Sequence, residues 1–163
     1  MKIAVCAGSF DPPSVGHINI IERGLNLFDK VIVAVAVNSS KKATFTDAER
    51  VTMLKEIFKE APNVEVDSFS DELLVNYARR KKANILLRGL RTVSDYEYEF
   101  QMALANKKLA PELETVFMMT EARYSHLSSS LIKEIVSLGG ESEDMLPTGI
   151  TKKLKSKLAR EKR

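Results

Sequence analysis

Five short β-rich runs, separated by amphipathic segments, constrain the fold of this chain more than any other feature. Every residue from 31 to 37 is apolar, and a strand that is apolar on both faces is typical of a parallel sheet covered by helices on both sides. The alternation of such strands with helices predicts an α/β fold with a doubly wound parallel sheet of five strands. We expect these strands at residues 2–7, 31–38, 64–69, 85–88 and 115–119.

The helices between these strands carry recognisable start signals. Thr46 with Glu49, and Ser94 with Glu97, match the capping box, in which two side chains bond the free N–H groups of the first helical turn. No repeat or long linker interrupts the chain, and 163 residues suit one compact core. We expect a single domain over residues 1–163, with a basic C-terminal helix or tail at about residues 147–163.

The net charge of +3 comes from this tail. Residues 152–163 hold seven Lys or Arg and one acid, which leaves 18 basic and 21 acidic residues in 1–151, a net charge of −3. Ile150, Leu154 and Leu158 recur every four residues and would dock the tail as a helix through one apolar face. The tail has no aromatic residue on which a base could stack. A solvated helix face is therefore favoured, and a nucleic-acid contact is the disfavoured alternative.

Composition excludes several other classes of protein. No apolar run reaches the roughly 20 residues of a membrane-spanning helix, and the first expected strand leaves no room for a signal peptide before it. Cys6 is the single cysteine, so it has no internal disulfide partner, and we interpret it as a buried structural thiol. These features predict a cytoplasmic protein with no membrane association.

The turn after the first strand is rich in Gly and Pro and leads into a helix whose first turn contains His17. Such a turn directs free backbone N–H groups and the positive end of the helix dipole at one point. An imidazole at the same place adds a further donor. This arrangement favours an anion, most naturally a phosphate.

Polar and basic residues follow four of the expected strands. In a doubly wound sheet the ligand lies beyond the carboxyl ends of the strands, so these residues should converge on one rim. They include Ser9 and His17, then Ser39, Ser40, Lys41 and Lys42, then Arg88 and Arg91, and finally Arg123, Tyr124, Ser125, His126 and Ser128 to Ser130.

The common nucleotide and hydrolase motifs are missing. The sequence has no GxxxxGK[ST] loop, no GxGxxG after the first strand and no GxSxG elbow. Two histidines and one cysteine make a zinc cluster improbable. The cations and His17 suit the stabilisation of charge on a phosphorus under attack. A substrate phosphate is already ionised at neutral pH, so as attacking group it would need no general base.

Each of these residues also has a plainer interpretation. His17 could bond a backbone carbonyl, and Lys41 could lie in a solvated loop. Arg91 could pair with Asp95 or Glu99 of the next helix, and the Ser128–Ser130 triplet could be an N-cap alone. Arg88 is harder to dismiss, because an arginine at the end of an apolar strand needs an anionic partner or an exit to solvent.

Four motifs, in this order, resemble those of the phosphopantetheine adenylyltransferases, a bacterial family in the HxGH nucleotidyltransferase superfamily. The likeness runs from about residue 2 to the helix before Gly139. Its motifs are GSFDPPSVGH at 8–17, SSKK at 39–42, LLRGLRTVSDYEYE at 86–99 and YSHLSSSLIKE at 124–134.

The resemblance implies a Rossmann-like fold of the nucleotidyltransferase type. It also implies reversible adenylyl transfer from ATP to 4′-phosphopantetheine, which yields dephospho-coenzyme A and pyrophosphate in coenzyme A biosynthesis. Mg²⁺ would be bound mainly through the ATP phosphates, with no metal ligands from the protein. Coenzyme A would act as a feedback ligand, and the assembly would be a homohexamer.

The resemblance also implies roles for site residues. Catalysis would rest on His17, Lys41, Arg88, Arg91 and Ser130, and 4′-phosphopantetheine would contact Ser9, Lys41, Leu74 and Arg88. ATP would contact Ser9, Phe10, His17, Gly89, Leu90, Arg91, Glu99, Tyr124, Ser125, His126, Leu127, Ser128, Ser129 and Ser130.

The chain departs from the family pattern at a few positions. Ser14 stands where the superfamily's first histidine lies and where this family usually has threonine, which favours this family over branches that act on other acceptors. Ser9 replaces a common threonine and keeps its hydroxyl, while Pro13 and His126 replace residues that are usually apolar or aromatic. Two alternatives stay open: another acceptor, such as nicotinamide mononucleotide or glycerol phosphate, and a nucleotide-sensing module whose basic tail engages a partner.

Overall fold

The computed structural model describes residues 1–38 and 42–161. One sheet of five strands, all paired in parallel, has the order β3-β2-β1-β4-β5. Its strands are β1 (Ile3–Gly8), β2 (Lys30–Val37), β3 (Val64–Ser70), β4 (Ile85–Leu90) and β5 (Glu114–Met119). The predicted doubly wound parallel sheet is confirmed, and every strand end lies within two residues of the expected one.

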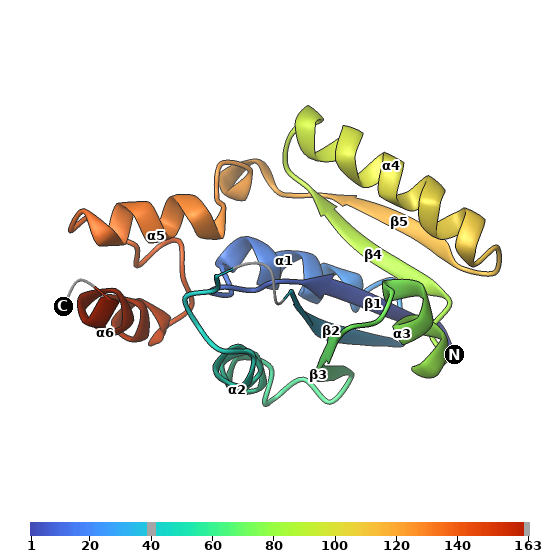
Figure 1. Cartoon of the computed structure of the whole chain (residues 1–163), viewed down its shortest axis with the longest axis horizontal. Helices are drawn as coiled ribbons and strands as arrows, with labels where there is room; N and C mark the ends of the chain where they lie inside the picture. Colours follow the sequence, from blue (N-terminus) through green and yellow to red (C-terminus); the bar gives the residue numbers. More distant parts are fainter. Residues whose placement is uncertain (39–41, 162–163) are drawn as a thin grey trace.

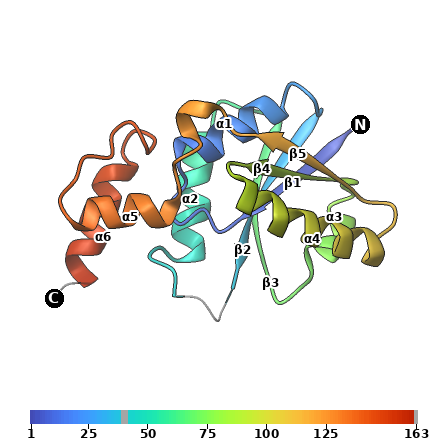
Figure 2. The ribbon, with the colours of Figure 1, turned by 90° about the horizontal axis from the view of Figure 1, so that it is seen from above.

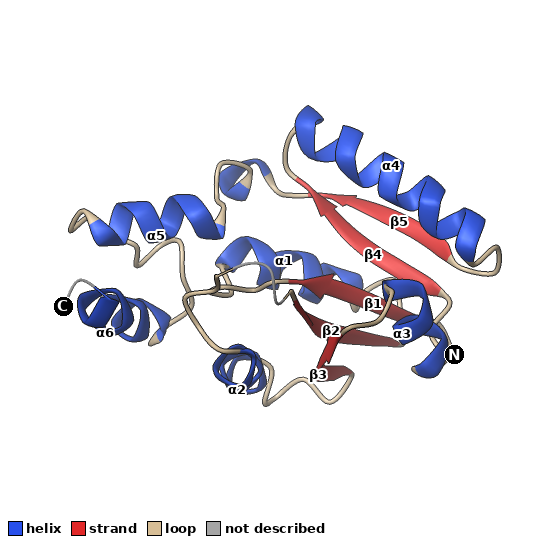
Figure 3. Cartoon of the chain, viewed as in Figure 1, coloured by secondary structure: helices blue, strands red, loops and turns tan. Residues whose placement is uncertain are grey.

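The strand order reverses at β1. The chain adds β2 and β3 on one side of β1, then crosses over to β4 and β5 on the other. Figure 3 shows the strands with their carboxyl ends pointing toward the same end of the molecule. A crevice is therefore expected beyond the carboxyl ends of β1 and β4, where the two halves of the sheet diverge.

The described part of the chain has six α-helices and one short 3-10 helix, Ala122–Tyr124 (Figure 1). Helices α5 and α6 lie side by side near the carboxyl ends of the strands, and α4 runs along β4 and β5 in both views (Figures 1 and 2). The helices are α1 (Val15–Gly24), α2 (Asp47–Ile57), α3 (Leu74–Arg80), α4 (Val93–Leu109), α5 (Ser129–Ser137) and α6 (Ile150–Glu161).

The two faces of the sheet are buried by different helices. Ala4 and Cys6 of β1 pack on the side of α1 and α2, whereas Val5 and Ala7 pack on the side of α3. This follows from the two-residue period of a strand, which sends successive side chains to opposite faces. Apolar residues at consecutive positions of β1 and β2 therefore complete two cores.

A third apolar cluster joins α2, α5 and α6. Ile150 and Leu154 are buried in it, and Leu158 packs against it. The four-residue spacing thus docks α6 by one face, as expected, and leaves Lys152 and Lys155 exposed. No described helix is both long and apolar enough to span a bilayer.

The predicted helix starts differ in outcome. The Thr46–Glu49 capping box of α2 is confirmed, with the Thr46 side chain accepting from the Glu49 N–H and the Glu49 side chain accepting from the Thr46 N–H. The Ser94–Glu97 box of α4 is wrong, because Thr92 caps this helix and accepts from the Asp95 N–H at 3.2 Å. Asp95 also bonds Arg91, and these contacts fix the first turn two residues earlier.

Candidate active site

His17 lies in the first turn of α1, at the carboxyl end of β1. The backbone N–H of Ser14 donates to its Nδ1 at 3.0 Å, while the Ser14 hydroxyl caps the helix by accepting from the His17 N–H. Because Nδ1 accepts a hydrogen bond, we assign the proton of the neutral ring to Nε2. The imidazole is therefore oriented as a hydrogen-bond donor.

The surroundings of His17 keep its ring neutral. Burial is the largest cause, and the positive charges of Arg91 and Arg88 act in the same direction, so that the pKa of His17 is lowered from 6.5 to about 4. The Phe10 ring packs edge-on against the imidazole, with centroids 5.1 Å apart. At neutral pH, His17 can thus donate a hydrogen bond to an anion without carrying charge itself.

Arg88, in β4, forms a bidentate ion pair with Glu99 of α4. Its Nε donates to one carboxylate oxygen at 2.8 Å, and its Nη2 donates to the other at 2.6 Å. Nη1 donates to the Ala7 carbonyl in β1. The strand-end arginine has therefore found an anionic partner, and its guanidinium is held across β1 and α4 with N–H groups still available.

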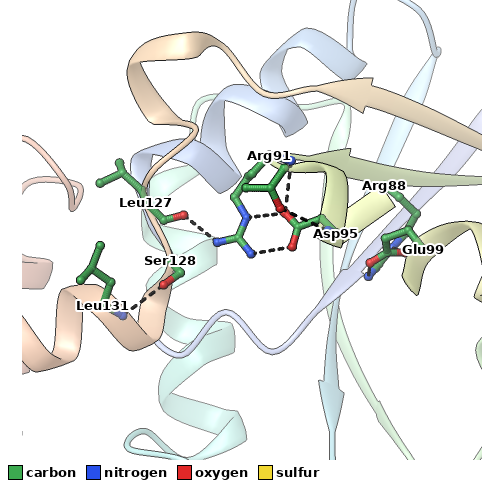
Figure 4. Close-up of polar contacts among 8 residues, drawn as sticks. Arg88, Arg91, Asp95, Glu99, Leu127, Ser128 and Leu131 are labelled. Carbon is green, nitrogen blue, oxygen red and sulfur yellow. Dashed lines mark hydrogen bonds and ion pairs between the residues drawn. The ribbon is translucent and has the colours of Figure 1, made fainter. Parts of the chain in front are cut away.

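Arg91 connects α4 to the segment before α5. Its Nε donates to Asp95 at 2.9 Å, and its Nη1 donates to the Leu127 carbonyl at 2.8 Å (Figure 4). The neighbouring Ser128 caps α5 by accepting from the Leu131 N–H at 3.1 Å. Arg91 thus lies beside a helix N-terminus, and both attract negative charge.

Two cavities meet at the Arg88–Glu99 ion pair. The first has a volume of about 350 Å³ and is lined by His17, Arg91 and the start of α5. The second, of about 370 Å³, is lined by more apolar residues such as Phe69, Leu74 and Met102. Both cavities are lined by Ala7, Gly8, Ser9, Arg88 and Glu99.

The structure brings most of the expected site residues to these cavities. The first cavity is lined by Ser9, Phe10, His17, Arg88, Gly89, Arg91, Glu99, Tyr124, Leu127, Ser128, Ser129 and Ser130. The second is lined by Ser9, Leu74, Arg88 and Glu99. Leu90, Ser125 and His126 line neither cavity, and Lys41 lies outside the described residues.

Gly89 lies where β4 packs closely against α1. A Cβ at this position would lie 3.0 Å from Ile20 Cγ1, which is tighter than an ordinary van der Waals contact, so the Ile20 side chain would have to shift. Glycine therefore permits the close contact between β4 and α1 beneath the first cavity.

Several residues at the site were missed by the sequence analysis. Thr120 lines the first cavity, and Tyr98 and Asn106 line the second. Buried Arg50 donates to the Ser9 carbonyl at 2.8 Å and so supports the turn before α1 from α2. The one sequence signal for the role of Arg50 is its position on the apolar face of the helix expected after Thr46.

The acidic residues of the site do not form a metal cage. No group of three or more His, Cys, Asp or Glu in residues 1–38 and 42–161 could hold a metal ion. Asp95 and Glu99, which line the first cavity, are each paired with an arginine. The donors of this site suit phosphate oxygens better than a protein-held cation.

Comparison with known proteins gives a consistent result. Residues 5–135 match the cytidylyltransferase-like family. A phosphopantetheine adenylyltransferase from Caldanaerobacter subterraneus subsp. tengcongensis is 54% identical over 96% of this chain and 98% of its own length, and one from Desulforudis audaxviator is 53% identical over 96% of each chain. A Vibrio parahaemolyticus crystal structure, provisionally assigned as a nicotinate-nucleotide adenylyltransferase, has the same fold, with a TM-score of 0.69, 18% identity and coverage of 94% of this chain and 99% of that one.

Proposed function

The chain belongs to the phosphopantetheine adenylyltransferases, nucleotidyltransferases with a cytidylyltransferase-like fold, and from this premise we propose how its site carries out the reaction. The enzyme transfers the adenylyl group of ATP to 4′-phosphopantetheine in coenzyme A biosynthesis. The observation that carries the proposal is the meeting of two cavities at Arg88, one polar and one largely apolar. ATP would occupy the first cavity and the acceptor the second.

The reaction is a direct in-line displacement. A phosphate oxygen of 4′-phosphopantetheine attacks the α-phosphorus of ATP, and a new P–O bond forms. The bond from that phosphorus to the oxygen bridging to the β-phosphate breaks, and its electron pair leaves with pyrophosphate. The product is dephospho-coenzyme A, and pyrophosphate attacks it in the reverse direction. No base is required, because the attacking phosphate is already ionised.

The residues contribute alignment and charge stabilisation. His17 donates from Nε2 to a non-bridging oxygen of the α-phosphate. Arg91, Ser130 and the N-terminus of α5 bind the triphosphate. Arg88 binds the acceptor phosphate with the N–H groups that Glu99 and Ala7 leave available, at the boundary between the cavities. Lys41 would add a further cation at the acceptor.

The remaining contacts follow the division into two cavities. Ser9 borders both and would contact both substrates, and Leu74 would contact the acceptor's pantetheine arm. The nucleotide would contact Phe10, Gly89, Leu90, Glu99, Tyr124, Ser125, His126, Leu127, Ser128 and Ser129.

Magnesium enters as part of the substrate. Since Asp95 and Glu99 are both paired with arginine, the ion would be bound mainly through the ATP phosphates, and the substrate is MgATP. Coenzyme A carries the same pantetheine arm as the acceptor and would compete for the second cavity, as a feedback ligand. We place the reaction in the cytoplasm, where both substrates are metabolites.

Helix α4 supports the proposed homohexamer. None of its residues is buried, and seven large apolar side chains on it are exposed. Neighbouring copies of the chain would cover such a surface. These side chains are Val93, Tyr96, Tyr98, Phe100, Met102, Leu104 and Leu109.

Pyrophosphate release tests the proposal. The enzyme is incubated with MgATP and 4′-phosphopantetheine, and in parallel with nicotinamide mononucleotide or glycerol phosphate. We expect pyrophosphate release in the mixture that contains 4′-phosphopantetheine and in neither of the other two. Release only with another acceptor would overturn the acceptor assignment and keep adenylyl transfer. Tight MgATP binding without release in any mixture would favour a nucleotide sensor instead.

A further inference from the structure

Asp11 is a buried carboxylate in the turn between β1 and α1, and the proposed reaction gives it no part. Only 5% of the residue is exposed. Its Oδ1 accepts from the Phe45 N–H at 2.8 Å, and its Oδ2 accepts from the Thr44 N–H at 2.9 Å and from Lys133 Nζ at 3.1 Å. One side chain thus joins the turn to the segment before α2 and to α5.

Lys133 is the cation of this junction. It lies in the second turn of α5, and the Lys133 and Asp11 side chains are only 26% and 8% exposed. A second bond joins the same two elements, since the Ser129 hydroxyl of α5 donates to the Pro12 carbonyl of the turn at 2.9 Å. Two contacts one helical turn apart therefore fix both the position and the tilt of α5 against the turn.

The two elements joined in this way both line the first cavity, the turn through residues 8–10 and the start of α5 through residues 128–130. Lys133 itself lines neither cavity. Its charge therefore acts on the site through Asp11.

We propose that Lys133 is a positioning residue for adenylyl transfer, which holds the N-terminus of α5 at a fixed place relative to His17 through its ion pair with Asp11. The inference rests on the proposed function, because it assumes that α5 binds the triphosphate. Without the ammonium group, Asp11 keeps two backbone donors, and the Ser129 bond to Pro12 is the one polar contact left of the two that join α5 to the turn. The helix N-terminus then shifts, and a misplacement of about 1 Å can lower a rate by about 100-fold.

Lys133→Met tests this role, because it keeps an unbranched side chain only one atom shorter and removes the charge. We expect kcat to fall by about 10-fold or more, while the KM for 4′-phosphopantetheine stays within about twofold, since the acceptor lies in the second cavity. Lys133→Arg should restore most of kcat. Lys153→Met is the matched control: it removes the 2.7 Å ion pair between α6 and Glu56 of α2, and it should leave both constants unchanged.

Thermal unfolding separates positioning from folding. Wild-type kcat in Lys133→Met, measured per folded molecule and accompanied by a lower unfolding midpoint, would show a structural role alone and overturn the proposal. An equal loss of kcat in Lys133→Arg would also overturn it, because the charge would then be irrelevant. A double-mutant cycle with Asp11→Asn should show that the two changes are not additive.

The wild-type enzyme distinguishes failure of this inference from failure of the proposed function. If it transfers adenylyl to a different acceptor, the same variants are compared with that acceptor. If it transfers to none, MgATP affinity becomes the readout. Weaker MgATP binding by Lys133→Met than by Lys153→Met would then support the positioning role, and equal binding would overturn it.

Discussion

Helices α1 and α4 both border the first cavity, yet they are held in the fold by different means. α1 is capped by Ser14, and its Ile20 and Ile21 are buried against the sheet. α4 has no buried residue, and its contacts near the site are the ion pairs of Glu99 with Arg88 and of Asp95 with Arg91.

This difference separates the two tasks of the site. α1 fixes His17 through apolar burial, which is insensitive to ligands. Arg88 and Arg91, in contrast, are paired with carboxylates of α4, and a substrate phosphate could replace or share these partners. The apolar side chains of α4 are exposed, and we propose that another copy of the chain covers them. In the proposed reaction, the α1 side would set the position of the reacting phosphorus, and the α4 side would respond to substrates and to assembly.

Removal of the His17 imidazole, the hydrogen-bond donor on α1, should have the largest effect on the reaction. His17→Ala is expected to lower kcat by about 10²–10³-fold, the range found when one donor to a developing oxyanion is lost. The KM for MgATP should change little, because the donor acts mainly as charge develops. Steady-state pyrophosphate release gives both constants. Normal turnover together with lost ATP binding would refute the role given to His17.

A change on the α4 side should mainly weaken the binding of a substrate. Arg88→Ala removes a charged donor to the acceptor phosphate, and such hydrogen bonds contribute about 1.5–3 kcal/mol. We expect the KM for 4′-phosphopantetheine to rise by about 10- to 100-fold, with a smaller change in kcat. Arg79→Ala serves as control, since neither Arg79 nor its ion-pair partner Glu112 lines either cavity. A loss of kcat alone in Arg88→Ala would place Arg88 with His17.

The apolar surface of α4 can be tested apart from catalysis. Leu104→Glu introduces a charge at a side chain that is 57% exposed in the monomer. Sedimentation should show a smaller assembly than for the wild type, while the monomer's free energy of unfolding changes by less than about 0.5 kcal/mol. Leu27→Glu, at an equally exposed leucine just after α1, should leave the assembly intact. An unchanged mass for Leu104→Glu would contradict the assembly role of α4.

The smallest expected effect is that of pH on stability and turnover through the protonation of His17. The pKa of His17 is lowered to about 4 in the folded chain, so the folded state resists protonation of this ring. Stability from the neutral ring is present above pH 6.5 and is lost as the pH falls toward 4, because the unfolded chain takes up the proton first. His17 should therefore add no titration to kcat between pH 6 and 8. Proton NMR, with His17→Gln for assignment, should give a midpoint near 4, and a midpoint near 6.5 would contradict this.

The features that the sequence predicts well are those that depend on residues close together in the chain. Strand runs such as 31–37 and the capping box at Thr46 depend on neighbouring residues, and both were predicted correctly. The start of α4 was misplaced, because Asp95 is engaged by Arg91 as well as by the helix cap.

Tertiary contacts account for the rest. Asp11 and Lys133 are 122 residues apart, and no local pattern pairs them. The motifs indicated which residues gather at the carboxyl ends of the strands, but they could not show that Arg88 and Glu99 divide the space into two cavities. The exposed face of α4 could not be distinguished from a buried one, since its apolar residues look the same in sequence.

In the reaction we propose, this site aligns two phosphates and supplies no nucleophile of its own. His17 accepts at Nδ1 and so presents a protonated Nε2. Cys6 lines the cavity, and burial raises the pKa of its thiol to about 11, so it is not a thiolate. The stereochemical course at the α-phosphorus tests this directly, with ATP made chiral there by sulfur. A single displacement predicts inversion of configuration, and retention would reveal a covalent adenylyl-enzyme and contradict the account.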